Sequence, residues 1–519
     1  MAGNERYRFP GVFTSEVPIG AEPLQPASGA AAAFIGTAEW GPMNEYTLVT
    51  SWADFVRLFG NDFDNGYLAL GARDFFRMGG QRLYVVRTCH YSDITDRTTL
   101  TAVKATATLD DGEVEPTDVL TVDAKYYGSL GNDLSVKICN YDVEDGFFDL
   151  EVIRSVNVGG STKTRLVERF QDMSTDSTDT ENFIEDIVND HLTKASIHIR
   201  VTVLDEAKVP EEATTALTTG DDGLTSIADT DYIGDDASDT GLYALDKVGE
   251  PLSICHPGIT TAAVLVGGQS YVNAHAPRKG IDIYVMDLPL AGTPQEAHAF
   301  VADNLQSNGN EAVYYPWVVE GVTEKPVAPY MCGIYAWNDY ERGVWAAPAG
   351  LNFPLPITEL DYECSLGDGQ LLNPRGINVI AHFPFEGFVP WGVRTLDVHT
   401  HFRYLNVRRF VNVIKKTLQD GGLQFVFELN APATWRRVED TARMLLMMYH
   451  SLGAFAGQTP EESFYAQCDE TTNPPELIEQ GILTCVVGIA AVKPAEFVEF
   501  EIQMFNVGDL PLASSPQES

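Results

Sequence analysis

Ile281-Asp-Ile-Tyr-Val-Met286 and Ala312-Val-Tyr-Tyr315 enclose a segment with helical apolar spacing around residues 294–306. Short apolar runs rich in β-branched and aromatic residues predict buried strands. The order strand, helix, strand is typical of a parallel strand pair with a crossover helix. Residues 246–370 therefore predict a parallel α/β layer.

The same sequence patterns predict the other strands and helices of this layer and of the N-terminal region. Before the quoted stretch we expect a strand at 262–266 and a helix around 268–277. Near the N-terminus, Ala31–Gly36 predicts a strand buried on both faces. Ser51 and Gly60 are placed to cap a helix at its two ends. A second helix over 67–78 and a strand over 83–87 complete a β-α-α-β fragment.

Two further regions differ in pattern from this layer. Between about 100 and 245 short β-rich runs alternate with turn residues, which predicts an inserted β-rich domain. From 376 onward we expect two long helices, the second capped by Thr434, and strands that include 377–381, 424–428, 482–492 and 497–505. The predicted fold class is a multi-domain chain of α+β and α/β type.

Both ends of the chain carry strand-like segments, at residues 9–17 and 497–505. The second segment alternates apolar and polar side chains, the period-2 pattern of a half-buried strand. Proline and glycine after residue 17 exclude a helix there and let the first segment sit away from its own domain. Each segment can pair with another copy of the chain or, alternatively, inside its own domain. The residues expected to make these contacts are Phe9, Val12, Phe13, Val17, Phe497, Val498, Phe500, Ile502 and Met504.

Composition describes an ordinary globular chain. It has 519 residues, of which 44% are hydrophobic and 21% charged, a length that predicts two to four domains. Since no run of 18 apolar residues occurs and the N-terminus opens no apolar stretch, neither a membrane span nor a secretory signal is expected. The seven cysteines lack C-x-x-C spacing, so we expect small core residues rather than a disulfide framework or a zinc site.

The formal charge of −40 is unevenly distributed and disfavours a nucleic-acid binder. Residues 174–250 hold 19 acidic and 4 basic side chains, which predicts a solvated outer surface. Residues 374–450 reverse the balance with 10 basic against 6 acidic side chains. Such a surface can face an acidic partner, although these side chains can also simply offset local carboxylates. The candidate basic residues are Arg403, Arg408, Arg409, Lys415, Lys416, Arg436 and Arg437.

Catalytic and cofactor patterns are weak. His399 and His401 lack a third ligand at metal-site spacing, and Cys255-His256 lacks an orienting third group. Asp282 and Asp287 flank a strand, where a lone Asp is more often a cap. No P-loop, G-x-S-x-G or G-x-G-x-x-G motif is present. The sequence therefore predicts no enzyme, no cofactor and no metal site.

Several ordered blocks resemble the contractile tail sheath proteins of phage tails, bacteriocin-like particles and injection systems. The resemblance covers about 1–90 and 250–505 and does not extend to residues 100–245. Trp391 and Arg394, which lie in one block, are expected to be core and salt-bridge residues. The blocks are Pro10-Gly-Val12, Tyr314-Tyr-Pro-Trp317, Gly333-Ile-Tyr-Ala-Trp-Asn-Asp339, Gly343-Val-Trp-Ala-Ala-Pro-Ala349, Leu372-Asn-Pro-Arg-Gly-Ile-Asn378, Trp391-Gly-Val-Arg-Thr395 and Asn406-Val-Arg-Arg409.

The resemblance implies a core domain built from N- and C-terminal parts, with terminal arms that add strands to neighbouring copies. The expected segments are an N-terminal arm and linker (1–30), the first part of the core (31–99), the inserted β-rich peripheral domain (100–245), a central α/β domain (246–373), the C-terminal core domain (374–493), and a C-terminal arm strand and tail (494–519).

The implied function is that of a sheath subunit. It polymerises helically around an inner tube and contracts to drive the tube through a cell envelope. The implied partners are further copies of the chain, the inner tail tube protein, and baseplate and tail terminator proteins, without nucleic acid or membrane insertion. The implied location is a virion tail or contractile particle assembled in the host cytoplasm, with the basic surface turned to the tube. The alternatives are another shell protein, of capsid or surface-layer type, and an α/β enzyme.

Overall fold

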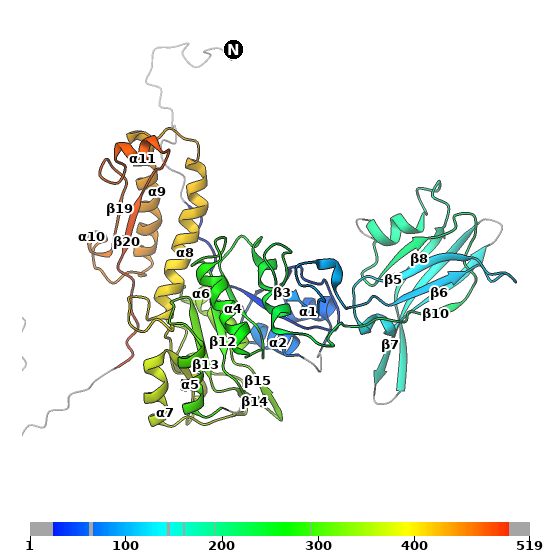
Figure 1. The fold of residues 1–519 in the computed structure, drawn as a ribbon, viewed down its shortest axis with the longest axis horizontal. Coiled ribbons are helices and arrows are strands. Elements are labelled where there is room, and N and C mark those ends of the chain that lie inside the picture. The colour runs from blue at the N-terminus through cyan, green and yellow to red at the C-terminus, as the bar shows by residue number, and fades with distance from the viewer. Residues whose placement is uncertain are drawn as a thin grey trace, which may run out of the picture.

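The computed structural model describes residues 24–61, 66–142, 146–158, 161–191, 194–290 and 292–497. An α/β body occupies the middle of the molecule (Figure 1). A β-rich region lies at one end of this body, and a region built on two long helices lies at the other (Figure 1). The described residues contain no helix that is long and apolar enough to cross a membrane.

The body is organised around one eight-stranded sheet within the described residues. Its six inner strands pair in parallel, and an antiparallel strand closes each edge. In sheet order the strands are β18 (Gly387–Pro390), β17 (Ile377–Phe383), β13 (Glu311–Tyr315), β12 (Ile283–Asp287), β11 (Leu252–Cys255), β1 (Ala31–Gly36), β3 (Arg82–Arg87) and β2 (Thr47–Val49). All six residues of β1 are buried, as expected for an inner strand covered on both faces.

Helices cover both faces of this sheet and divide its apolar side chains into two cores. One face is covered by α1 (Trp52–Phe59), α2 (Leu68–Arg77) and α6 (Ala328–Glu341). The other face packs against α4 (Ala262–Ala274), α5 (Pro294–Asn304) and the end of α7 (Leu366–Leu372), with the short α3 (Asp229–Ile233) beside α4. Ser51 caps α1 as predicted, because its side chain accepts the N–H of Asp54 at 3.1 Å.

The predicted strand at 262–266 is wrong, because these residues form the first half of α4. A short apolar run is equally compatible with a buried helix, and the strand of this unit is β11, ten residues earlier. Gly267 and Gly268 lie inside this helix. A side chain at either position would collide with a neighbouring side chain. A Cβ on Gly268 would lie 2.2 Å from the ring of Tyr284. The glycines thus allow close packing of α4 on the sheet.

The sheet combines strands from three segments that the sequence separated. β1 to β3 come from 31–99, β11 to β13 from 246–373, and β17 and β18 from 374–493. The expected boundary between a central α/β domain and a core domain therefore runs through one continuous sheet. Parallel pairing of β1 with β11 and of β13 with β17 makes this connection.

The β-rich region has its own core and two sheets. One sheet contains β4 (Thr106–Asp110), β5 (Asp118–Ala124) and β9 (Ile199–Val203). The other contains β10 (Thr214–Ala216), β6 (Leu134–Asp142), β7 (Phe147–Val158) and β8 (Ser161–Ser174). Buried side chains from both sheets, such as Val122 and Leu150, meet in the shared core.

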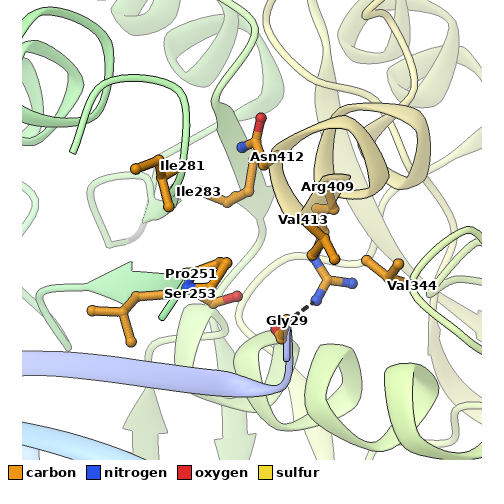
Figure 2. A pocket seen from close by; sticks show the side chains of 10 residues that line it. Gly29, Pro251, Ser253, Ile281, Ile283, Val344, Arg409, Asn412 and Val413 are labelled. Carbon is orange, nitrogen blue, oxygen red and sulfur yellow. Dashed lines mark hydrogen bonds between the residues drawn. The ribbon is translucent and has the colours of Figure 1, made fainter. Parts of the chain in front are cut away.

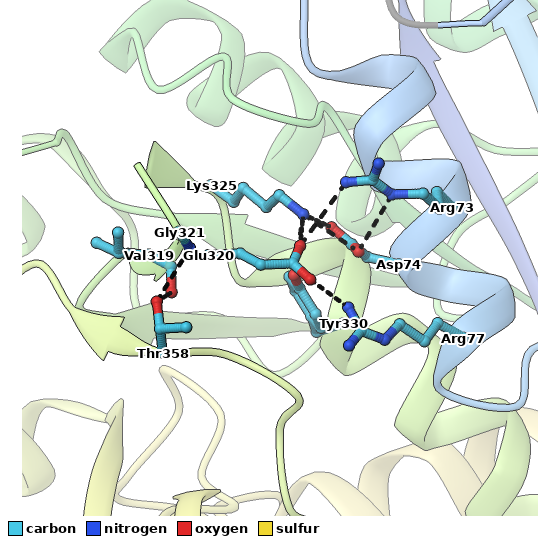
Figure 3. Close-up of polar contacts among 9 residues, drawn as sticks. All are labelled: Arg73, Asp74, Arg77, Val319, Glu320, Gly321, Lys325, Tyr330 and Thr358. Atoms are coloured by element: carbon cyan, nitrogen blue, oxygen red, sulfur yellow. Dashed lines mark hydrogen bonds and ion pairs between the residues drawn. The ribbon is translucent and has the colours of Figure 1, made fainter. Parts of the chain in front are cut away.

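A buried ionic network ties α2 to a small three-stranded sheet made of β14 (Val318–Glu320), β15 (Thr323–Lys325) and β16 (Glu359–Leu360). Lys325 lies between Asp74 and Glu320, and its ammonium group is 3.1 Å from Asp74 (Figure 3). Arg77 donates to Glu320 at 2.6 Å (Figure 3). Burial opposes the charge of Glu320, but the hydrogen bonds from Lys325 and Arg77 prevail and lower its pKa to about 2.

The C-terminal region packs α8 (Leu405–Gly422) against α9 (Pro432–Ser451) and a two-stranded sheet of β19 (Phe464–Gln467) and β20 (Val486–Ile489). The short helices α10 (Pro460–Ser463) and α11 (Pro475–Glu479) flank β19. Phe410, Leu446 and Phe455 lie in the core between these elements.

Two predictions in this region are wrong. Residues 424–428 form the end of a 3-10 helix (Leu423–Phe425) and a turn rather than a strand, and Phe427 is fully exposed with a φ of +69°. Thr434 does not cap α9, because the helix already begins at Pro432, with Ala431 at the cap position. Proline is favoured at the first helical position, since it needs no N–H partner there.

Candidate strand-docking site

The sheet of β19 and β20 leaves an outer edge on β20 within the described part of the chain. The N–H of Ala490 donates to the carbonyl of Ser463 at 2.8 Å, and hydrogen-bond direction alternates along an antiparallel ladder. The backbone N–H and C=O groups of Val487 and Ile489 consequently point away from β19. They are free to pair with one further strand.

An open groove of about 990 Å³ lies between β20 and α8. Along α8 it is lined by Val407, Val411, Ile414 and Leu418, which recur at intervals of three and four residues on one helix face. The strand side contributes Val487, Ile489, Ala490 and Ala491, and Ala456 closes one side. The groove therefore combines an edge strand with an apolar floor, the arrangement by which sheets accept an added strand.

Positive charge borders this groove. Its lining includes Lys415 and Lys493. Burial, together with the nearby charges of Arg408 and Lys279, lowers the pKa of Lys415. The ammonium group donates to the carbonyl of Lys279 rather than to a carboxylate. An acidic neighbour would relieve this repulsion, so the groove favours an occupant that is apolar on one face and acidic on the other.

The chain leaves the described structure close to this region through an ion pair. Glu496 accepts hydrogen bonds from Arg394 at 2.7 and 2.5 Å, and both side chains are mostly buried. Arg394 also donates to the carbonyl of Asn373 at 3.0 Å. The expected salt-bridge role of Arg394 is confirmed. The expected core role of Trp391 is wrong, since its side chain is 52% exposed and lies against the ring of Phe383.

The predicted terminal strands lie almost wholly outside the described residues. Phe497 is described and is 81% exposed. The remaining strand residues, which are Phe9, Val12, Phe13, Val17, Val498, Phe500, Ile502 and Met504, fall outside. Their pairing stays a prediction.

The seven candidate basic residues do not form one surface. Arg409 is 3% exposed and forms an ion pair with Asp339 at 2.6 Å. It also donates to the carbonyl of Gly29 at 3.3 Å, beside a small cavity between the sheet and α8 (Figure 2). This guanidinium joins α8 to the body. Arg409 therefore does not face outward as expected.

Four other members are half-buried, and each donates a hydrogen bond within the chain. Arg403 donates to the carbonyl of Val398, and Arg408 donates to Asn310 at 2.6 Å. Lys415 borders the groove, and Lys416 pairs with Asp420 one turn along α8. Only Arg436 and Arg437 of the seven are exposed, both in the first two turns of α9. Arg437 lies 3.7 Å from Glu428.

The candidate catalytic groups have structural roles. His256 is buried and hydrogen-bonds Tyr284, and burial lowers its pKa to about 4, so the ring is neutral. Asp282 pairs with Arg278, and Asp287 accepts the N–H groups of Val327 and Ala328 at the start of α6. His399 and His401 are exposed.

One group in the described residues has the composition of a metal site. The ligand atoms of Asp236, Asp246 and His275 lie within 4.8 Å of one another. Asp246 already accepts from Tyr271 at 2.7 Å and contacts His275 at 2.6 Å. These bonds make the group a polar network that joins α4 to the segment before β11.

Comparison with known proteins identifies this architecture. Residues 397–505 match the family described as the phage tail sheath C-terminal domain. The resemblance to contractile tail sheath proteins is confirmed. The matched family region contains α8, α9, β19 and β20, and with them the groove and the edge strand.

Relatives and solved structures agree with this result. The tail sheath protein of Vibrio phage KVP40 is 27% identical over 278 residues, which cover 51% of this chain and 38% of that protein. The tail sheath protein of Enterobacteria phage T4 is 25% identical over 34% of this chain and 26% of its own length. The matches thus span less than half of these relatives.

The fold extends over nearly the whole chain. The helical sheath of the anti-feeding prophage in its contracted state superposes with a TM-score of 0.57 at 20% identity, covering 96% of this chain and 99% of that one. The sheath tail protein of Listeria innocua gives a TM-score of 0.59 at 13% identity, with coverage of 91% and 97%. The chain has the multi-domain fold of sheath proteins, including the inserted region.

Proposed function

We propose that this chain is the structural subunit of a contractile tail sheath, which polymerises around an inner tube and contracts to drive that tube through a cell envelope. The observation that most supports this proposal is the open edge of β20 beside the apolar groove. Both lie inside the region that matches the sheath C-terminal domain. Both features serve polymerisation, since an open strand edge with a shaped apolar floor holds one specific extended segment.

The C-terminal strand of a neighbouring copy fits this groove by pattern and charge. In residues 497–505, Val498, Phe500, Ile502 and Met504 alternate with Glu499, Glu501 and Gln503. Paired with β20, the apolar set enters the groove, and the two glutamates lie near its basic border. Each added backbone hydrogen bond contributes about 0.5–1.5 kcal/mol, so affinity comes from several bonds along the strand.

In this proposal the C-terminal strand pairs with a neighbouring copy rather than within its own chain. The ion pair with Arg394 fixes the point from which the strand departs. Such an arm can link neighbours while their bodies rotate and slide during contraction. The N-terminal segment around Phe9, Val12, Phe13 and Val17 supplies a second arm in this proposal.

The remaining partners follow from the same role. Arg436 and Arg437 on α9 face an acidic inner tube, and the acidic 174–250 segment faces outward. Baseplate and terminator proteins bind the ends of the polymer. The particle is a phage tail or a related contractile device, assembled in the host cytoplasm, and its action needs neither catalysis nor a cofactor because the energy is stored in the extended assembly.

Negative-stain electron microscopy of three purified chains tests this proposal. These are the full chain, a chain lacking residues 1–20 and a chain lacking residues 498–519. Tubes or stacked rings from the full chain, and neither from the truncated chains, are expected. Closed shells or flat arrays would favour a capsid or surface-layer subunit. Monomers from the full chain, even with its tube added, would contradict the proposal.

A further inference from the structure

Two cysteines face each other across the β19–β20 hairpin. The ladder ends with Gln467 opposite Val486, and Cys468 and Cys485 are the next residues on its two sides. The two thiols lie close enough for each to influence the pKa of the other. Both residues are free cysteines. The hairpin thus brings together two sulfur atoms from residues 17 positions apart in the sequence.

The register suits a covalent bond between them. Because Ala490 donates to Ser463, alternation places Cys468 and Cys485 at a non-hydrogen-bonded position. Opposite Cα atoms at such positions are about 4.5 Å apart. Disulfides require a Cα separation of about 4.4–6.8 Å, so no strand has to move far.

Hydrogen bonds already close the connecting loop at this point. The side chain of Asn473 donates to the carbonyl of Thr484 at 3.1 Å and accepts its N–H at 2.6 Å. The same amide group contacts the sulfur of Cys468 at 3.7 Å. The loop that carries α11 is therefore held beside the two thiols, and its closure entropy is largely lost before any bond forms.

Exposure differs between the two cysteine residues. Cys468 is 2% exposed, whereas Cys485 is half-buried. A second thiol pair in the body, Cys255 and Cys332, is sealed in the core at 0% and 1% exposure. An oxidant from solution therefore reaches Cys485 first, and the Cys255–Cys332 pair serves as an internal comparison.

We propose that Cys468 and Cys485 form a dithiol site that low-molecular-weight disulfides convert into an intrachain disulfide. The Cys485 thiolate attacks one sulfur of the small disulfide, forms a mixed disulfide and releases one small thiol. Cys468 then attacks the protein sulfur, forms the Cys468–Cys485 bond and releases the second small thiol. The two protein thiols lose two electrons and two protons in all, and the small disulfide gains them.

The reaction is slow at neutral pH. Burial raises the pKa of Cys485 to about 12 and also raises that of Cys468, so the reactive thiolate is scarce. The thiolate fraction grows about tenfold for each pH unit below the pKa. The dithiol persists in a reducing cytoplasm and closes in an oxidising medium.

The consequence for assembly rests on the proposed function. The disulfide would link the end of β19 to the start of β20. The outer edge of β20 is the edge that receives a neighbour's arm in the proposed function. In a particle released from a cell, this disulfide would form in the sheet that links the subunits. The chemistry of the dithiol site itself does not depend on that role.

The test uses the full chain treated with oxidised glutathione at pH 7.5 and 8.5, followed by intact mass and non-reduced peptide mapping. An endoprotease that cuts after glutamate separates the two cysteines at Glu470, Glu476 and Glu479. We expect a loss of two hydrogens, a linked peptide containing Cys468 and Cys485, and a rate about tenfold higher at pH 8.5. The linked peptide should disappear in Cys468→Ser and in Cys485→Ser but persist in Cys364→Ser.

Other outcomes would overturn the proposal. A glutathione adduct that stays on Cys485 without closing, or a linked Cys255–Cys332 peptide in its place, would contradict it. The mass measurement is made on the chain in any assembly state, so a failure to polymerise leaves it readable. Tube formation by the reduced chain is scored separately and tests only the proposed function.

Discussion

Arg394 and Glu496 form a two-bond ion pair, with lengths of 2.7 and 2.5 Å, where the chain leaves its C-terminal domain. Tyr404 lies 3.4 Å from the same carboxylate. Charged hydrogen bonds of this kind contribute about 1.5–3 kcal/mol when they are shielded from water. The pair therefore holds Glu496 against the C-terminal domain.

Removing this anchor should loosen the C-terminal segment. In Arg394→Ala and in Glu496→Gln we expect cleavage after Glu499 by a glutamate-specific protease to accelerate severalfold, and assembly to decline. Limited proteolysis followed by mass spectrometry measures the rate. Arg375→Ala, which removes an exposed arginine near the same sheet, is the matched control. Equal cleavage rates in all variants would refute the anchoring role.

Arg409 should matter for folding rather than for contact with a tube. Arg409→Ala leaves Asp339 buried without its cation, which costs about 3–5 kcal/mol. Arg436→Ala, on the exposed face of α9, should change the free energy of unfolding by less than about 0.5 kcal/mol. Urea unfolding of both variants provides the comparison. A mild effect of Arg409→Ala would mean that the buried pair is dispensable.

Charge reversal on α9 should weaken assembly on tubes. Arg436→Glu combined with Arg437→Glu is expected to reduce sheath formation on the inner tube strongly at low salt, while the monomer stays folded by circular dichroism. Lys163→Glu with Arg165→Glu, two exposed basic residues on β8, is the control with equal charge change. Assembly unaffected by the α9 reversal would remove the tube-facing assignment.

Acid should weaken the contact between α2 and the β14–β15 hairpin. The folded pKa of Glu320 is about 2, below its ordinary value of 4.5, so the folded state binds fewer protons than the unfolded state. Its stabilising effect is complete above about pH 4.5 and is lost as pH falls towards 2. Thermal unfolding from pH 6 to 3 should therefore drop less steeply in Glu320→Gln than in the parent chain. Parallel curves would contradict this assignment.

The sequence predicted elements best where local chemistry determines them. Ser51 and Gly60 bound α1 in the way that capping rules indicate. The sequence predicted secondary structure less well where one apolar run suits both a helix and a strand. Over five residues, a buried helix and a buried strand have the same apolar pattern. The run beginning at Ala262 forms a helix whose Gly268 packs closely on Tyr284, and this long-range contact cannot be read from the run itself.

The candidate site was only half visible in the sequence. The alternation over 497–505 indicated a strand that needs a partner, but the groove requires α8 and β20 to lie side by side. Charge counting also treated Arg409 and Arg436 alike, because composition does not record which arginine faces Asp339 inside the fold. Pairing of Cys468 with Cys485 likewise depends on the register of the hairpin.

A mixing experiment tests strand exchange most directly. One chain lacks residues 498–519 and keeps its groove. The other carries Val487→Pro, which removes an outward N–H from the β20 edge, where proline is tolerated, and keeps the strand. Val487→Ala, which retains the N–H, is the control for loss of the side chain.

The masses of these chains, alone and mixed, are measured by analytical ultracentrifugation. Each chain alone should stay monomeric or nearly so, and the mixture should form heterodimers, because one supplies a groove and the other a strand. The control carrying Val487→Ala should associate by itself. A mixture that remains monomeric while the unmodified chain polymerises would contradict exchange of the C-terminal strand into the β20 groove.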